Sequence, residues 1–299
     1  MGPLLALASA VFYGVADFTG GLLARRAGFA LVALTGQVAG LALTLAAAPL
    51  FPAHGPALPD LAWGALSGTG TGLGMVFLYR GMSRGAMSVV VPVSAVGGLA
   101  LPVLAAVAVL GDRPSALSWL GILVAVPSLW LASRSAPTPG APAAVTGASL
   151  DGLTAGAGIA LQYAALAQAG QSSGIWPVTA GRVTAVAVIL PAALLALRAA
   201  GPKAAAADRA GSAARAARTV LTPRRAAGAA ATGMAAALAL VLYLLATREQ
   251  IVTVAVVLSS LYPAIPVLLG LTALRERPTG LQSAGLVGAA VATGLLTAG

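Results

Sequence analysis

Residues 102–114 read PVLAAVAVLGDRP and residues 266–278 read PVLLGLTALRERP, so one pattern returns after 164 residues. Both segments begin and end with proline, and in each an acid precedes the penultimate arginine. The same offset, without a gap, aligns further informative residues: Gly64 with Gly228, Tyr79 with Tyr243, Arg84 with Arg248 and Gly121 with Gly285. Pro, Arg and Tyr are rare enough here for such matches to indicate an internal repeat, and therefore two homologous halves.

The beginning of each half aligns at smaller offsets. An offset of 150 pairs Gly2 with Gly152 and Tyr13 with Tyr163. An offset of 145 pairs residues 36–38 (GQV) with residues 181–183 (GRV).

The composition indicates that lipid surrounds most of this chain. Of the 299 residues, 59% are hydrophobic and 8% are charged, and the mean hydropathy is +0.95. A soluble domain typically carries about 25% charged residues, and a helix needs about 20 apolar residues to cross a membrane. Ten runs of about that length occur, near residues 3–23, 29–49, 60–80, 86–110, 115–133, 150–169, 174–198, 225–247, 250–274 and 279–298.

We therefore expect an all-α membrane protein with ten transmembrane helices. Strands of a barrel would be about 10 residues long with alternating polarity, which these runs are not. Each half holds five runs, and because five is odd, the second half must enter the membrane from the opposite side. This is the inverted-repeat plan of many secondary transporters. The expected units are a first repeat over 1–133, a linker over 134–148, and a second repeat over 149–299 with a basic loop near 199–224.

Several classes of function are disfavoured. The chain has no Cys, one His (His54) and seven acids, so we expect no metal site, no cofactor and no enzymatic activity. The net charge of +10 is spread over gaps between apolar runs, which argues against nucleic acid as a partner. The glycine-rich stretch at 64–74 lacks the Gly-Lys-Ser/Thr of a phosphate loop. Its four-residue spacing predicts close helix packing instead.

Three segments resemble EamA-type proteins of the drug/metabolite transporter superfamily. Residues 256–266 (VVLSSLYPAIP), 274–279 (LRERPT) and Gly285 are similar to the family signature, and residues 92–121 resemble it in the first half. Residues 13–18 (YGVADF) resemble the family's aromatic-Gly motif. The resemblance implies ten helices in a five-plus-five inverted arrangement and, in many members, export of amino acids, other metabolites or drugs. The family often has Arg in the second helix of a half. Arg182 matches, whereas Gln37 stands in the first half, which argues against a symmetric binding role.

Two ionisable residues inside spans are the main candidates for a substrate-binding or coupling site. An ionised group within a span usually faces a cavity or a partner. Asp17 could couple protons or bind a substrate amine, or instead reach the interface or pair with Arg25 or Arg26. Arg182, about eight residues into its span, could bind a substrate carboxylate. Its structural alternative is a pair with Asp17 or with another helix.

Uncharged polar residues at span depth complete the candidate set: Tyr13, Gln37, Ser94, Gln162, Ser259 and Tyr262. Each could orient a ligand by hydrogen bonding or simply tie two helices together. Gln162 and Tyr163 are adjacent and should point about 100° apart, so we do not expect both to face the centre of one cavity.

These features predict a secondary transporter of small molecules that works by alternating access, with export favoured. Uptake, or a non-transporting membrane subunit, is the alternative. The expected location is the plasma membrane, with the lipid bilayer and a small-molecule substrate as partners, and proton coupling and oligomeric state left open. Arg and Lys gather in the loops after odd-numbered spans, which predicts cytoplasmic loops there and both termini outside. The family resemblance implies cytoplasmic termini, and we give slight preference to the strong charge bias.

Overall fold

The computed structural model describes residues 1–24, 27–51, 53, 55–83, 87–109, 111–133, 145–199, 221–265, 268–269 and 279–298. Several features named from the sequence lie outside these ranges: Arg25, Arg26, His54, Arg84, Arg134, Pro266, most of the linker and of the basic loop, and residues 270–278.

The described residues form ten α-helices, and each overlaps one of the ten apolar runs. They are α1 (Gly2–Ala24), α2 (Phe29–Ala47), α3 (Leu58–Ser83), α4 (Met87–Ala108), α5 (Ala116–Ser133), α6 (Val145–Leu166), α7 (Trp176–Ala199), α10 (Pro223–Glu249), α11 (Val252–Ser259) and α13 (Gly280–Ala298). Two short 3-10 helices, η1 (Ala48–Leu50) and η2 (Gln171–Ser173), follow α2 and precede α7. Within these ranges there is no strand, so the expectation of an all-helical protein is confirmed.

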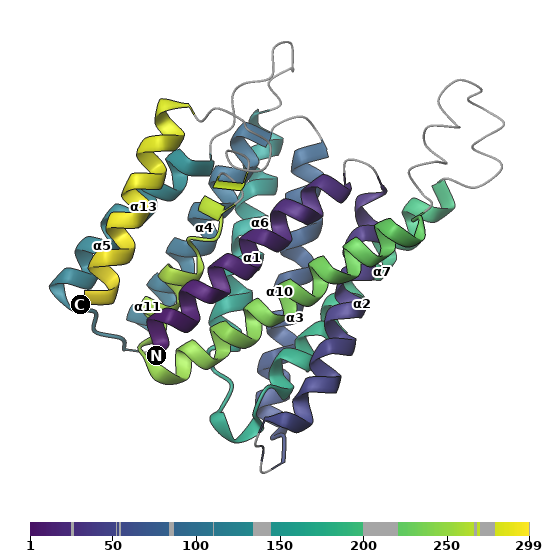
Figure 1. Ribbon diagram of the computed structural model, residues 1–299, viewed down its shortest axis with the longest axis horizontal. Helices are drawn as coiled ribbons and strands as arrows, with labels where there is room; N and C mark the ends of the chain where they lie inside the picture. The colour runs from purple at the N-terminus through teal and green to yellow at the C-terminus, as the bar shows by residue number, and fades with distance from the viewer. Residues whose placement is uncertain are drawn as a thin grey trace.

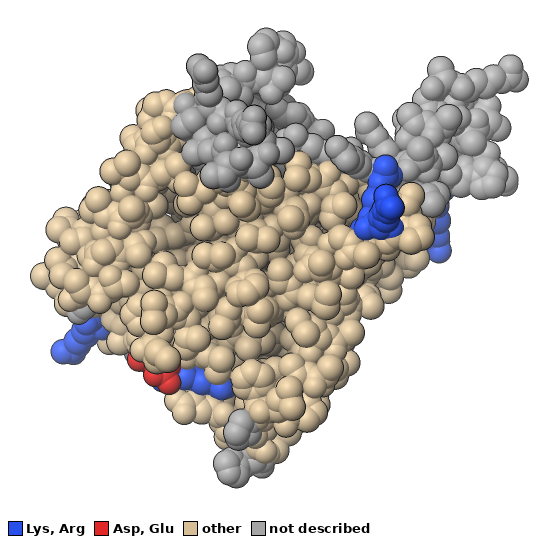
Figure 2. Space-filling model, viewed as in Figure 1, with Lys and Arg blue, Asp and Glu red and all other residues tan. Residues whose placement is uncertain are grey.

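Within the described ranges, six helical segments are long and apolar enough to cross a membrane. They are Gly2–Ala24, Ala30–Leu50, Leu58–Leu78, Trp176–Leu195, Pro223–Glu249 and Gly280–Ala298. Two shorter apolar helices cover Val93–Ala108 and Ala116–Leu131. In Figure 2 the coloured Lys, Arg, Asp and Glu side chains lie toward opposite ends of the visible face, with a broad uncharged region between them. This distribution is compatible with a multi-pass membrane protein.

The ninth run departs from the expectation of one continuous helix over 250–274. The α-helix α11 ends at Ser259, and residues 260–263 form turns. Backbone bonds there span three residues, from Tyr262 N to Ser259 O (3.4 Å) and from Ala264 N to Leu261 O (3.0 Å). Pro263 has no N–H to donate to Ser259, so the α-helical ladder cannot continue through this point. The run is therefore interrupted near its middle.

Glycines on α3 allow close contact with two other helices, as their spacing predicted. A Cβ added at Gly64 or Gly68 would collide with the backbone of Pro177 or Gly181 on α7. Gly70 and Gly74 face α6 instead, where an added Cβ at Gly70 would collide with the carbonyl of Gly158. The alternating sides explain why the glycines form two interleaved series.

The same contacts give the relative directions of neighbouring helices. Position 64 lies beside 177 and position 72 beside 188, so α3 and α7 run parallel. Gly36 lies beside Ala229 and Gly40 beside Ala237, so α2 and α10 are also parallel. In contrast, α5 and α13 are antiparallel, because position 121 lies beside 296 and position 288 beside 128.

Helix contacts divide most of the molecule into two groups. In the first bundle (α3, α4, α6, α7), α3 packs on α6 and α7, and α4 packs on α6. In the second bundle (α1, α2, α10, α11), α10 packs on α1 and α2, and α11 packs on α1. Helices α5 and α13 lie side by side at one edge of the molecule (Figure 1). Each bundle thus combines helices from before and after the linker.

The two termini lie at the same end of the molecule, which we call the terminal end (Figure 1). The interior is tightly filled there. Its buried core joins the start of α1, the end of α6, the start of α7, the end of α10 and α11; it includes Ala6, Tyr163, Leu166, Ile175, Val178, Tyr243, Leu244 and Val256.

Candidate functional site

A cavity of about 100 Å³ lies between the two bundles. It is lined by residues of α1, α2, α3, α6, α7 and α10 and by Tyr262, which follows α11. The lining extends to Ala24 and Leu78, near the ends of α1 and α3, and so toward the end opposite the termini. The cavity has room for several water molecules or a small solute.

Six of the eight residues selected from the sequence line this cavity: Tyr13, Asp17, Gln37, Gln162, Arg182 and Tyr262. They come from four helices (α1, α2, α6 and α7) and the turn after α11, so the fold brings together groups that are far apart in the chain. Their roles in binding or coupling remain predictions, but their convergence on one space is a property of the structure.

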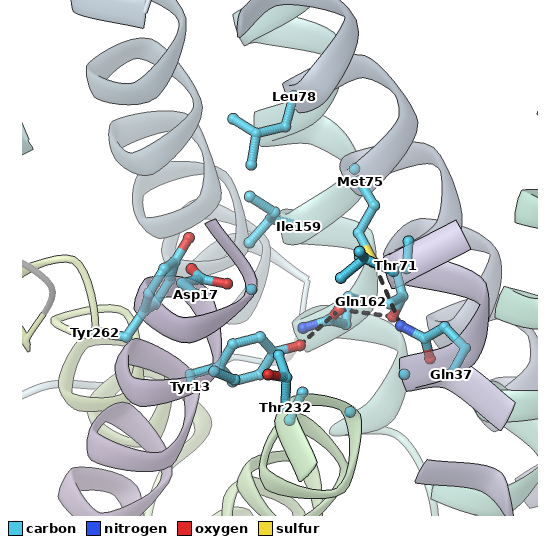
Figure 3. Close-up of a pocket in the computed structure, with 18 of the residues that line it drawn as sticks. Tyr13, Asp17, Gln37, Thr71, Met75, Leu78, Ile159, Gln162, Thr232 and Tyr262 are labelled. Carbon is cyan, nitrogen blue, oxygen red and sulfur yellow. Dashed lines mark hydrogen bonds between the residues drawn. The ribbon is translucent and has the colours of Figure 1, made fainter. Parts of the chain in front are cut away.

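Gln162 connects three helices at the wall of the cavity (Figure 3). Its side-chain Oε1 accepts hydrogen bonds from the Tyr13 hydroxyl (3.1 Å) on α1 and from the Thr71 hydroxyl (2.6 Å) on α3. Its backbone carbonyl accepts a hydrogen bond from Ser67 Oγ (2.8 Å), also on α3. Gln162 therefore holds α6 to α3 within the first bundle and also reaches α1 across the cavity.

Arg182 is buried in the wall formed by α7, with 1% of its surface exposed. Its Nη1 donates to Gln37 Oε1 (2.8 Å), and its Nη2 donates to the backbone carbonyl of Ala236 (2.6 Å). Its Nε is buried and has no hydrogen-bond partner. All its described partners are thus uncharged, and the guanidinium charge has no counter-ion among the described residues.

Asp17 lies one helical turn after Tyr13 and on the same side of α1. Its side chain is exposed, and Figure 3 shows it beside Tyr262 and pointing into the space below Ile159 and Leu78. It makes no hydrogen bond or ion pair with the part of the chain that the structure describes. The direct pair with Arg182 that the sequence left open is therefore not formed.

Tyrosine rings connect the cavity to the filled terminal end. Tyr13 contacts Tyr262 and Tyr163, with ring centroids 5.5 Å and 6.4 Å apart. Tyr163 in turn packs edge-on against Tyr243 (4.6 Å), whose hydroxyl donates to the Tyr163 carbonyl (2.9 Å). Aromatic rings therefore line the side of the cavity that faces the terminal end.

Gln162 and its neighbour Tyr163 both line the cavity. Helix α6 also contributes Ile159 to the lining, one turn before Tyr163.

Ser94 and Ser259 do not line the cavity. Ser94 is 3% exposed on α4, where its backbone packs against Gly156 of α6. Ser259 is buried at the end of α11, and its hydroxyl donates to the backbone carbonyl of Ala6 (3.3 Å). Their positions fit the helix-tying alternative better than contact with a ligand.

Sequence reasoning missed Thr71, Met75 and Thr232, which also line the cavity. Met75 Sδ accepts a hydrogen bond from Gln37 Nε2 (3.3 Å), and the Thr232 and Thr19 hydroxyls lie 3.0 Å apart. Thr71 lies within the glycine-rich stretch, which was interpreted only as a packing surface. Its position three residues after Gly68 and three before Gly74 was the available signal that a polar group faces inward there.

Comparison with known proteins gives the fold but no activity. No family model matches the chain, and no curated protein matches it. Among solved structures, one titled "Crystal structure of protein" is similar with a TM-score of 0.72 and 17% sequence identity. The match covers 99% of this chain and 96% of that one. At this identity the likeness shows a shared helical fold alone.

Proposed function

We propose that this chain is a secondary transporter that carries small metabolites or drugs across the cell membrane by alternating access. One observation carries the proposal: a cavity between two helix bundles is lined by an acid and an arginine that have no ionic partner among the described residues. Charged groups inside membrane-spanning segments are costly and usually serve a pathway or a ligand. A cavity that contains both kinds of charge suits binding of a polar solute within a lipid-facing protein. Export is the favoured direction.

An inverted pair of five-helix repeats underlies this proposal. If ten helices cross the membrane in alternating directions, the third and seventh run parallel, as do the second and eighth, while the fifth and tenth run antiparallel. The directions of α3 with α7, α2 with α10, and α5 with α13 support this pattern. The plan also agrees with the sequence resemblance to EamA-type transporters, which we retain as part of the proposal.

The two bundles are suited to move against each other. Within each bundle, glycines bring backbones together, as at Gly68 with Gly181 or Gly36 with Gly233. Between the bundles, several contacts are side-chain hydrogen bonds, which a small movement can break. These include Tyr13 with Gln162, Gln37 with Arg182, and Arg248 Nη2 with the carbonyls of Gly170 (3.1 Å) and Gly174 (2.7 Å). Rigid bodies that are joined in part by such breakable polar contacts support a rocking motion.

The filled terminal end and the cavity near the opposite end support assignment of this structure to one of two access states. In the other state, the first bundle and the second bundle would separate at the terminal end. Val178 lies 145 residues after Ala33, the offset that relates α2 to α7. Ala33 lines the cavity, whereas Val178 is buried in the terminal core. These two positions should therefore exchange exposure during transport.

The absence of native cysteine makes this exchange directly measurable. Ala33→Cys and Val178→Cys, each as the single cysteine, would be labelled in sealed vesicles with a membrane-impermeant maleimide from either side. We expect Ala33→Cys to react from one side and Val178→Cys from the other, each at least about tenfold faster than Leu195→Cys, a control exposed on the outer surface of α7. If Val178→Cys stays unreactive from both sides, alternating access is wrong and the non-transporting subunit is the better explanation.

A further inference from the structure

We propose that the cavity selects small zwitterions, with Arg182 holding the anionic group and Asp17 the cationic group. This inference rests on the proposed transport function and names its substrate class. It follows from two observations. Neither side chain has an ionic partner among the described residues, and both line one cavity without forming a pair with each other.

The arginine provides the anion subsite. A guanidinium has five N–H donors, and among the described residues Arg182 donates only to Gln37 and Ala236, both uncharged. A buried charge without a counter-ion is unfavourable by several kcal/mol, whereas a bound carboxylate would supply two parallel charge-assisted hydrogen bonds. The Nε of this side chain is buried and makes no hydrogen bond to the described residues.

The aspartate provides the cation subsite. Asp17 is exposed to the cavity and makes no described contact that would neutralise it. Figure 3 shows the Tyr262 ring beside its carboxylate. A cation held by Asp17 would therefore lie close to an aromatic face, which adds to its binding. The rings of Tyr13 and Tyr262 also offer an apolar surface for the organic part of the solute.

The two subsites are separated by a series of bonded side chains. Arg182 bonds to Gln37, Gln37 to Met75, and Met75 lies one turn after Thr71 on α3. Thr71 and Tyr13 both bond to Gln162, and Asp17 lies one turn after Tyr13. This framework keeps the acid and the arginine from neutralising each other. A solute with only one charge would satisfy one subsite and leave the other ion without a partner, so a zwitterion fits better than an anion or a cation.

The test compares three forms of one solute. Alanine, leucine and phenylalanine are each supplied as the free zwitterion, as the methyl ester, which lacks the anion, and as the N-acetyl derivative, which lacks the cation. Binding to the purified full-length protein in nanodiscs is measured by calorimetry. We expect at least one zwitterion to bind about tenfold or more tightly than both of its derivatives.

Two isosteric variants assign the subsites. In Arg182→Gln the advantage of the zwitterion over its methyl ester should disappear, while its advantage over the N-acetyl form remains. In Asp17→Asn the reverse is expected. If no zwitterion binds, if a singly charged form binds as tightly, or if both variants lose both preferences together, the proposal is overturned. If Ala33→Cys and Val178→Cys react from opposite sides but no zwitterion is preferred, the proposed substrate class is wrong and the transport function stands. If a zwitterion is preferred but both cysteines react from one side only, the transport function is wrong and the binding preference stands.

Discussion

Gln37 and Arg182 occupy matching positions in the two halves and contact each other where α2 lies against α7, with 2.8 Å between Oε1 and Nη1. The repeat aligns these two residues at an offset of 145. Because a guanidinium is only a donor, the contact fixes the Gln37 amide with its oxygen toward Arg182 and its nitrogen toward Met75. The first half has Gln37 where the second half has Arg182, and the contact between them is therefore one with an uncharged partner. It leaves the Arg182 charge without a counter-ion among the described residues.

Gln37→Glu should stabilise the protein and weaken its binding site. The new carboxylate would form an ion pair with Arg182 and give its buried charge a counter-ion, which the neutral Gln37 amide does not. We expect the melting temperature to rise by a few degrees and zwitterion affinity to fall about tenfold or more. Thermal unfolding and calorimetry on the same preparation would measure both.

Gln37→Met is the matched control, because it keeps the length of the side chain and removes the acceptor. Its stability should fall by about 1–3 kcal/mol, the cost of an unsatisfied buried donor. A Gln37→Glu variant that retains full affinity would show that Arg182 does not hold the anion.

Arg248→Ala should shift the protein toward the state that is open at the terminal end. Arg248 donates from α10 to two carbonyls in the loop between α6 and α7, and so joins the two bundles at that end. Loss of hydrogen bonds from a charged donor is worth about 1.5–3 kcal/mol, which corresponds to a shift of about tenfold or more between states. The labelling rate of Val178→Cys should rise by that factor.

Arg113→Ala provides the control for charge at the same end, since Arg113 is exposed and makes no described contact. It should leave the rate of Val178→Cys labelling within about twofold of the parent. Equal rates of Val178→Cys labelling in the Arg248 and Arg113 variants would show that Arg248 does not hold the two bundles together at the terminal end.

Gly68→Ala should destabilise the first bundle. A Cβ at this position would collide with the Gly181 backbone and the Thr184 hydroxyl, and overpacking typically costs about 1–3 kcal/mol. Gly21→Ala, on α1 with open space around the added carbon, should instead stabilise by up to about 1 kcal/mol. Chemical or thermal unfolding in detergent would compare the two. A neutral Gly68→Ala would mean that α3 and α7 can separate without penalty.

The sequence predicts the helices and much of the site, but not the state of the cavity. Runs of about 20 apolar residues place the helices, and the spacing of Gly64, Gly68 and Gly72 predicts close packing because only glycine admits a backbone so near. Asp17 and Arg182 can be identified from the sequence because a charged group within an apolar run is costly and usually faces a cavity or a partner.

Other features depend on tertiary contacts that no local pattern records. Ser259 resembled a site residue, yet its hydroxyl is satisfied by the carbonyl of Ala6, 253 positions away in the chain. The interior is filled at the terminal end, whereas the cavity extends toward the other end, and the internal repeat does not predict this difference. In the transport cycle that we propose, the two arrangements differ by only a few kcal/mol, so the sequence is compatible with both.

Pro263→Ala should slow the exchange between access states. The proline interrupts the ninth apolar run between Ser259 and Ala264, beside the cavity residue Tyr262 and within the second bundle. Alanine would restore an N–H that can donate to Ser259 O, extend α11 as a regular helix, and stiffen the point where the run can bend.

Pro127→Ala removes a helix-interior proline from α5, which packs on α13 outside both bundles, and should leave exchange unchanged. In single-cysteine vesicles, we expect the rate of Val178→Cys labelling to fall about threefold to tenfold with Pro263→Ala, while thermal stability rises. If both proline variants change the rate equally, the break after α11 is a fixed shape of the fold and not a hinge.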